Sequence, residues 1–128
     1  MIYGIGVDMV DISEFENLVK KLGKCFIEAT FTKKEVELSV QHPEPIRFLA
    51  ERFAVKEAVF KAIAHHTKAK TFDFRIVETL DDEARKPYVS INDSFKLIVE
   101  EAGICSIMVS LAKEKDYTIA FVIAQGAY

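Results

Sequence analysis

The feature that most constrains this chain is the stretch of residues 52–63, which reads as a helix with charged side chains on a largely apolar body. Glu57 and Lys61 are four residues apart, so they lie on one face of that helix, one turn from each other. A charged group on a mostly buried helix must be paired, bound to a metal or exposed in a cleft, because unpaired burial costs too much free energy. The same helix has a flank of small side chains that another backbone can approach closely, formed by Ala54, Ala58 and Ala62.

The N-terminal residues give the second clue. Residues 2–7 read as a strand, and Gly4 and Gly6 within it allow another segment to pack closely against the backbone. Asp8 is expected at the end of this strand, where the chain turns into a helix. An acid in that place serves either turn chemistry and helix initiation or a functional site, and both interpretations stay open on this segment alone.

Length and charge exclude several classes of protein. A chain of 128 residues is expected to form a single domain, residues 1–128. Half of the residues are hydrophobic, which allows both a core and an oligomer interface. The net charge of −3 argues against a general nucleic-acid binder. No apolar stretch approaches the roughly 20 residues of a membrane span and no leader opens the chain, so we expect a soluble, cytoplasmic protein without a membrane partner.

The two cysteines, Cys25 and Cys105, are far apart in the sequence and lack the spacing of a metal site. Each stands beside an apolar residue, so we expect two buried, reduced thiols.

Helix signals divide the first half of the chain. A capping box at Ser13 and Glu16 is expected to open a helix that ends at Gly23. A second capping box at Thr32 and Glu35 opens a short helix, and the long helix follows from about residue 45 to 64.

The second half of the chain is expected to hold most of the strands. The remaining elements are a half-buried strand at residues 72–76, a hairpin turn at 81–87 leading into a strand at 88–91, a helix at 94–102, and strands at 107–112 and 117–124. Hairpin-linked strands with segregated helices predict an α+β fold with a mainly antiparallel sheet.

Two segments together resemble a known family. Residues 4–8 (GIGVD), followed about fifty residues later by residues 48–62 (FLAERFAVKEAVFKA), resemble the paired motif of the 4′-phosphopantetheinyl transferases. The short chain resembles the holo-acyl-carrier-protein synthase type within that superfamily. The likeness continues through residues 72–76, 86–89 and 109–111, and it implies the transferase fold, a mainly antiparallel sheet wrapped around a long central helix.

The resemblance implies a phosphoryl transfer. A family member moves the 4′-phosphopantetheine arm of coenzyme A to a serine of apo-acyl carrier protein, releases adenosine 3′,5′-bisphosphate, and thereby serves fatty acid biosynthesis. Such chemistry needs a divalent cation, positioned charges and an oriented nucleophile, and Mg²⁺ prefers oxygen ligands. The resemblance also implies a homotrimer with the coenzyme site between neighbouring subunits.

The resemblance assigns roles to residues of the two motifs. Asp8 and Glu57 match the acids that bind the metal, and Glu57 is the expected base, directly or through a bound water. Lys61 is expected to neutralise charge on the leaving bisphosphate.

Four further residues are expected to contact coenzyme A. Arg52 matches a family position that contacts a coenzyme phosphate, and Phe48 lies one turn earlier on the same side of the helix. Lys56 is a weaker phosphate candidate, because it faces about 100° away from Glu57. Lys113 stands near the place of a family histidine and serves either a phosphate or as a plain charge of the hairpin.

The chain departs from the family pattern at several places. Ala64 and His66 replace glycines that usually follow the long helix, and Arg85 replaces a glycine before the Lys-Pro of the hairpin. Glu14 stands where the family generally has an arginine that grips the acidic carrier protein, and like charges across an interface weaken docking. A basic patch for the carrier remains available at Lys20, Lys21 and Lys24.

Two alternatives follow from these departures. A divergent family member would keep the fold but act on a different carrier, or bind coenzyme A without efficient transfer. A non-enzymatic α+β interaction module would use Asp8, Glu57 and Lys61 as structural charges only, with the last two as an ordinary i,i+4 ion pair.

Overall fold

The computed structural model describes residues 1–68 and 73–127 of the chain. Its elements follow in the order β1 (Ile2–Asp11), α1 (Ile12–Thr30), α2 (Lys33–Gln41), α3 (Pro45–Ile63), η1 (Ala64–His66), η2 (Phe74–Ile76), β2 (Glu78–Asp81), β3 (Pro87–Ser90), α4 (Asp93–Glu101), β4 (Ile104–Lys113) and β5 (Tyr117–Gly126).

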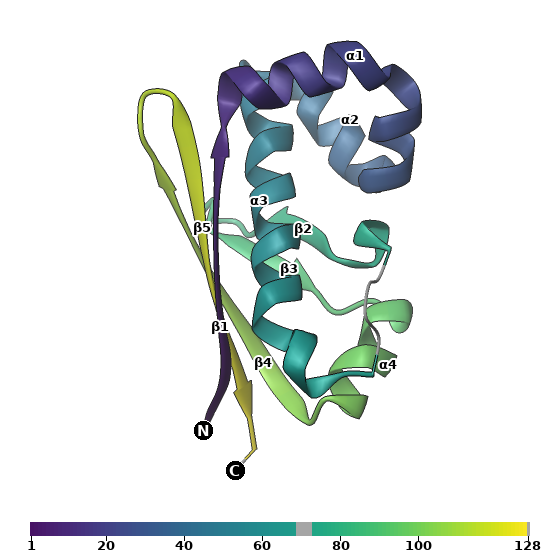
Figure 1. Cartoon of the computed structure of the whole chain (residues 1–128), viewed down its shortest axis with the longest axis vertical. Coiled ribbons are helices and arrows are strands. Elements are labelled where there is room, and N and C mark those ends of the chain that lie inside the picture. The colour runs from purple at the N-terminus through teal and green to yellow at the C-terminus, as the bar shows by residue number, and fades with distance from the viewer. Residues whose placement is uncertain (69–72, 128) are drawn as a thin grey trace.

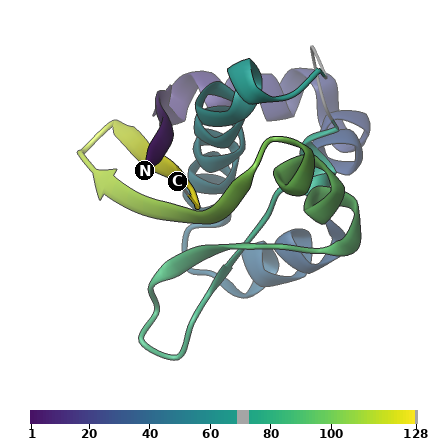
Figure 2. The same ribbon diagram turned by 90° about the horizontal axis from the view of Figure 1, so that it is seen from below.

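The strands form two antiparallel sheets. The larger sheet has the order β1-β5-β4, and α3 lies along one of its faces (Figure 1). The smaller sheet is the β2–β3 hairpin, which extends away from the helices when the molecule is seen from below (Figure 2). The α+β prediction with a mainly antiparallel sheet around a long helix is therefore confirmed. Within the described residues, no helix combines the length and apolar character that crossing a membrane requires.

The backbone of β1 lies directly on α3. A Cβ atom built on Gly6 would lie 1.8 Å from the carbonyl oxygen of Ala58, and one built on Gly4 would lie 1.8 Å from that of Ala62. Both alanines are almost fully buried. The glycines of the N-terminal strand and the small flank of the long helix are thus the two sides of one contact.

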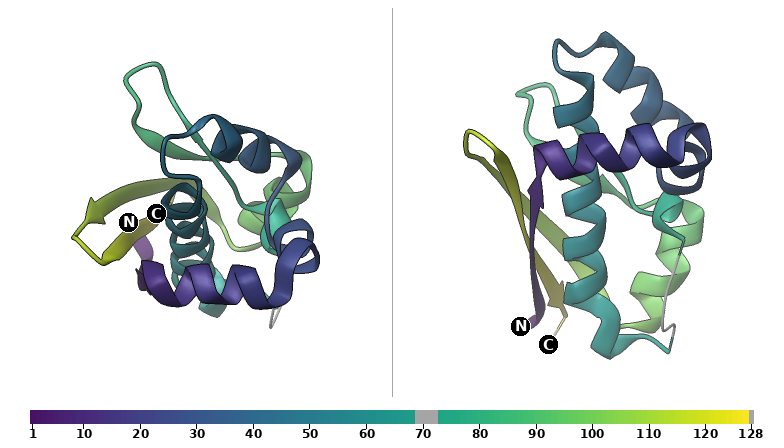
Figure 3. Two further views of the ribbon diagram at one scale, coloured as in Figure 1. Left: turned by 90° about the horizontal axis from the view of Figure 1, so that it is seen from above. Right: turned by 45° about the horizontal axis from the view of Figure 1, so that its top comes forward.

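Helix α1 lies across α3, and α2 follows it in the chain and also packs against α3 (Figure 3). The contact of α1 with α3 is aromatic, since the rings of Phe15, Phe26, Phe31 and Phe53 pack with centroids 5.6–6.4 Å apart. The spacing is that of edge-to-face and tilted aromatic pairs. This cluster holds α1 across α3 at Phe53, near the middle of that helix.

Two features of α1 differ from the prediction. Its N-cap is Asp11, whose side chain accepts a hydrogen bond from the backbone N–H of Glu14 (3.1 Å), so the capping box expected at Ser13 and Glu16 is wrong. Gly23 does not end the helix but kinks it, with φ 64° and ψ −146°. Glycine tolerates this left-handed backbone because it has no Cβ.

The capping box of α2 is confirmed. The Thr32 hydroxyl accepts from the Glu35 N–H, and the Glu35 carboxylate accepts from the Thr32 N–H.

Asp8 was expected at the end of the first strand, but β1 continues beyond it. The pairing of β1 with β5 continues three residues further, to Asp11 opposite Tyr117. Because side chains alternate along a strand, Asp8 shares the α3-facing side of β1 with Gly4 and Gly6.

The strand expected at residues 72–76 is also wrong. Phe72 lies outside the described residues, and residues 74–76 form a short 3₁₀ helix. The carboxylate of Asp73 caps this turn by accepting from the backbone N–H of Arg75 (2.9 Å), and the strand begins only at Glu78. A local side-chain-to-backbone bond here competes with the sheet.

The expected burial of the thiols is wrong as well, because Cys25 and Cys105 are both free and exposed. Cys25 follows the kink of α1, and Cys105 lies where the pairing of β4 with β5 shifts register.

We predict that Gly6→Ala is strongly destabilising, because its Cβ would overlap a backbone atom of α3. Overpacking a core lowers the free energy of unfolding by about 1–3 kcal/mol, and a clash with a backbone atom should cost an amount at or above the upper end of that range. Gly23→Ala is the control, since that position has open space around it and only a positive φ. Denaturant unfolding of both variants checks the ranking, and a Gly6→Ala protein as stable as wild type would contradict the contact.

Candidate active site

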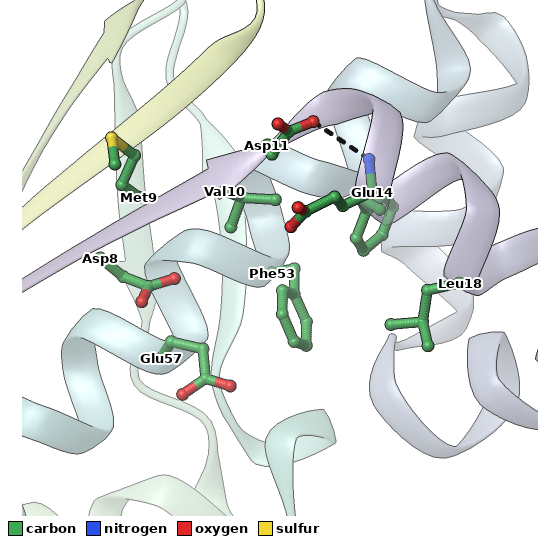
Figure 4. A pocket seen from close by; sticks show the side chains of 9 residues that line it. Asp8, Met9, Val10, Asp11, Glu14, Leu18, Phe53 and Glu57 are labelled. Atoms are coloured by element: carbon green, nitrogen blue, oxygen red, sulfur yellow. Dashed lines mark hydrogen bonds between the residues drawn. The ribbon is translucent and has the colours of Figure 1, made fainter.

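The structure brings Asp8 and Glu57 together from elements far apart in the sequence. Asp8 projects from β1 and its side chain is only 17% exposed. Glu57 projects from α3, and both line a pocket of about 320 Å³. Figure 4 shows the two carboxylates at one end of this pocket, with Phe53 beside them. The contact between β1 and α3 is what places one acid next to the other.

The Lys61 ammonium supplies the positive charge beside these two acids. Its Nζ donates to Oδ1 of Asp8 (3.0 Å) and to the carbonyl of Val7 (3.2 Å). The i,i+4 ion pair between Glu57 and Lys61, which the non-enzymatic alternative invoked, is thus replaced by a pair between the helix and the strand. The ammonium remains half exposed, so a bound anion can reach it.

The electrostatics of the pair favour a bound cation. Burial raises the pKa of the Glu57 carboxyl, the negative charge of Asp8 raises it further, and Lys61 opposes both effects. Two carboxylates that disfavour each other's charge are relieved by a divalent cation between them. Among the described residues no group of three or more His, Cys, Asp or Glu side chains could hold a metal. Two carboxylates nevertheless fit Mg²⁺, which usually takes one or two and completes its shell with water and phosphate oxygens.

A larger groove lies on another side of α3. Its volume is about 900 Å³, within the range of small-molecule sites, and Phe48, Arg52 and Lys113 line it. The Arg52 guanidinium stacks 4.1 Å above the Phe48 ring and donates to Oδ2 of Asp81 (2.9 Å). Its Nε is buried and has no hydrogen-bond partner in the described structure.

The pocket and the groove share no lining residue. Arg52 and Glu57 are five residues apart, which on a helix turns them about 140° from each other. The structure therefore does not bring the coenzyme candidates Phe48, Arg52 and Lys113 to the acids within one chain.

The structure gives Lys56 no access to a bound phosphate. Its ammonium is fully buried and pairs with Glu35 at 2.8 Å. Burial lowers the pKa of Lys56, while the Glu35 carboxylate opposes that change. The expected phosphate contact is therefore corrected to a structural role.

Lys113 lies 3.6 Å from a carboxylate oxygen of Glu51 at the rim of the groove. It is therefore placed in the groove, as a phosphate ligand requires, and is already partly neutralised there.

Sequence reasoning missed three further residues of the groove and one buried acid. The residues are Lys34, Arg85, Tyr88 and Glu35. The sequence predicts a capping box at Glu35, but a capping box involves only nearby backbone groups. It therefore does not predict the pairing of Glu35 with the distant Lys56. The other three reach the groove from α2 and the β2–β3 hairpin, whose positions no local pattern specifies.

Known proteins resemble this chain along nearly its whole length. Residues 4–122 match the model of the 4′-phosphopantetheinyl transferase superfamily. A holo-[acyl-carrier-protein] synthase of Serratia proteamaculans (strain 568) is 37% identical over 125 residues, which are 98% of each chain. The crystal structure of holo-[acyl-carrier-protein] synthase from Neisseria meningitidis has a TM-score of 0.88 and 34% identity, covering 98% of this chain and 99% of that one.

A further relative was solved with a ligand. The holo-(acyl-carrier-protein) synthase of Bacillus anthracis str. Ames, in complex with CoA (3′,5′-ADP), has a TM-score of 0.78 and 25% identity, covering 99% of each chain. The chain belongs to the 4′-phosphopantetheinyl transferase superfamily. Within it, the chain is of the holo-[acyl-carrier-protein] synthase type and is a transferase, which the non-enzymatic alternative does not fit.

We predict opposite shifts of the Glu57 pKa in two variants. Asp8→Asn removes the neighbouring negative charge and lowers the pKa, whereas Lys61→Met removes the positive charge and raises it. Carbon-detected NMR titration of the Glu57 carboxyl without metal measures both. Equal values in wild type and both variants would contradict the proximity of the three groups.

The raised pKa also predicts the pH dependence of stability. The folded state holds the Glu57 proton more tightly than the unfolded chain does, so this group contributes stability below its ordinary value of 4.5. That contribution is lost as the pH rises through the raised value. Relative to wild type, Glu57→Gln should therefore gain unfolding free energy over that interval, measured in metal-free buffer.

Proposed function

We propose that this protein transfers 4′-phosphopantetheine from coenzyme A to a serine of apo-acyl carrier protein and releases adenosine 3′,5′-bisphosphate. The observation that carries the proposal is the meeting of Asp8 of β1 and Glu57 of α3 at one pocket, with Lys61 paired to Asp8. The named relatives and the coenzyme complex of one of them support the substrate assignment. The reaction serves fatty acid biosynthesis in the cytoplasm.

Asp8 and Glu57 are the residues that would hold Mg²⁺. Their mutual repulsion and oxygen donors fit this ion, which when bound supplies positive charge to the diphosphate of coenzyme A. Glu57 accepts the proton of the carrier serine, directly or through a water, and its raised pKa suits that task. The serine oxygen forms a bond to the phosphorus that bears the pantetheine arm, and the bond from that phosphorus to the bridging oxygen breaks. Lys61 stabilises the negative charge that develops on the leaving bisphosphate.

The coenzyme groove completes the site from a neighbouring subunit. Because the acid pocket and the groove lie on different sides of α3, Arg52, Phe48 and Lys113 of one subunit are proposed to contact the nucleotide whose diphosphate lies at Asp8 and Glu57 of the next. This arrangement is what the proposed homotrimer provides.

The outer face of the larger sheet supports assembly. Opposite α3, β1 exposes Ile5 (62%), Val7 (42%) and Met9 (60%), while β4 and β5 expose Met108 (49%) and Phe121 (48%). The register places Val7 beside Phe121. Side chains of this kind on one sheet face favour burial against a second copy of the chain.

One observation favours a different carrier as the second candidate. Glu14 lines the acid pocket with Asp11, so a carrier helix approaching this rim meets negative charge (Figure 4). A carrier with a less acidic face near its serine would be preferred over a strongly acidic one.

We predict that the wild-type protein adds the mass of phosphopantetheine to an apo-carrier when coenzyme A and Mg²⁺ are present. Glu57→Gln and Asp8→Asn should each lower the rate by about 10²-fold or more, the usual scale for general-base and charge-positioning groups. Mass spectrometry of the carrier measures the reaction. Glu16→Gln on α1 is the control. If neither the wild-type protein nor any variant modified any of several carriers, the result would contradict transferase activity and leave coenzyme binding as the function.

We predict that Phe121→Glu separates the subunits, because it buries a charge in the proposed interface. Light scattering after gel filtration should show a trimer for wild type and a monomer for the variant. Transfer should fall at least about tenfold, since pocket and groove no longer meet. Leu97→Glu, at an exposed position of α4, is the matched control and should keep the trimer. A monomeric variant with wild-type transfer would contradict the shared site.

A further inference from the structure

A fully buried ion pair lies beneath the coenzyme groove. Nζ of Lys56 on α3 is 2.8 Å from Oε1 of Glu35 on α2, and both side chains are 0% exposed. Buried charges persist only where their hydrogen bonds are satisfied, because desolvation of each ion costs several kcal/mol. The partners of this pair therefore show what it holds together.

Those partners are backbone groups of the chain that leads into the hairpin. Lys56 donates to the carbonyls of Phe74 (2.8 Å) and Val77 (2.5 Å). Glu35 accepts from the backbone N–H of Thr79 on β2 (3.1 Å). The ammonium thus uses three acceptors, and the carboxylate bonds to both α2 and β2.

The elements joined in this way are walls of the groove. Lining residues come from α2, α3 and β2, for example Lys34, Arg52 and Leu80. The β2–β3 hairpin belongs to a separate two-stranded sheet, so no ladder of hydrogen bonds ties it to the larger sheet. A hairpin of two strands is marginally stable by itself and needs such an anchor.

A second charged link between α3 and the hairpin lies inside the groove. It joins Arg52 to Asp81, and under the proposed function Arg52 also contacts a coenzyme phosphate. Under that function, Arg52 would exchange Asp81 for a phosphate when the coenzyme binds. The Arg52–Asp81 pair therefore cannot by itself hold the groove in shape before the coenzyme binds. The Lys56–Glu35 pair, by contrast, is closed off from solvent and from the groove's ligand.

We propose that Lys56 and Glu35 are positioning residues that hold the β2–β3 hairpin and α2 against α3 in the arrangement that binds coenzyme A. They touch neither the substrate nor the reacting atoms. Their loss should weaken the affinity for the coenzyme. Asp8 and Glu57, the proposed metal ligands, are held in place by the contact between β1 and α3 and should not be affected. The inference rests on the proposed function, since it concerns the groove of that reaction.

The test separates positioning from folding. Lys56→Met leaves Glu35 as an unpaired buried charge, so it lowers both stability and coenzyme affinity. The double variant Glu35→Gln, Lys56→Met carries no buried charge and should recover stability, because neutral replacements of a buried pair are well tolerated. It still lacks the ammonium that bonds to the carbonyls of Phe74 and Val77. Val99→Ala, in the buried face of α4, is the control for a general loss of stability.

Steady-state kinetics, calorimetric binding of coenzyme A and thermal unfolding are measured on all four proteins. In the double variant we expect KM and Kd for coenzyme A to rise about tenfold, the effect of one lost charge-assisted contact, with kcat within about threefold of wild type. Val99→Ala should lose stability and keep the wild-type KM. A folded double variant with wild-type KM and Kd would overturn the proposal.

Two other results would also overturn it. A double variant that cannot fold would assign the pair to folding alone. A parallel fall in kcat and the folded fraction, at constant KM, would do the same. Failure of the proposed function is distinct, because the wild-type protein would then transfer nothing, whereas failure of this inference leaves wild-type transfer intact.

Discussion

Direct contact between the backbones of β1 and α3 underlies the rest of this structure. Gly4 and Gly6 allow the strand to lie on Ala58 and Ala62 at a separation that leaves no room for a Cβ atom. Asp8 follows on the same side of the strand and reaches Lys61, one turn from Glu57 on the helix. Larger residues at either glycine would separate the strand from the helix, and the two acids would no longer share a pocket.

The same helix organises two chemically different surfaces. One side carries Glu57 and Lys61, which face Asp8 of β1; another carries Arg52, which stacks on Phe48 and pairs with Asp81 of the hairpin. Lys56 lies between them in the sequence and points into the core, where it pairs with Glu35. A single helix can serve three purposes in six residues because successive side chains turn by about 100°. Division of the site between two sides of one helix is the reason for proposing that a second subunit completes it.

Much of the fold could be predicted from the sequence, because its signals are local. The long helix and the capping box at Thr32 and Glu35 both depend on residues three or four positions apart. Predictions failed where a local bond competed with a pattern. Asp73 caps a 3₁₀ turn where alternating residues indicated a strand, and Asp11 takes the N-cap in place of Ser13.

By itself the sequence determined the fold class, because the spacing of residues in helices and strands fixes which side chains share a face. Its two motifs also indicated the family and singled out Asp8 and Glu57 as candidate metal ligands. Only the tertiary structure decided which charged side chains pair with one another. Lys61 pairs with Asp8 across fifty residues rather than with Glu57 on its own helix, and Lys56 pairs with Glu35 rather than meeting a phosphate. The physical reason is that the energy of a charge depends on its burial and on its nearest opposite charge, and both are set by packing between distant segments.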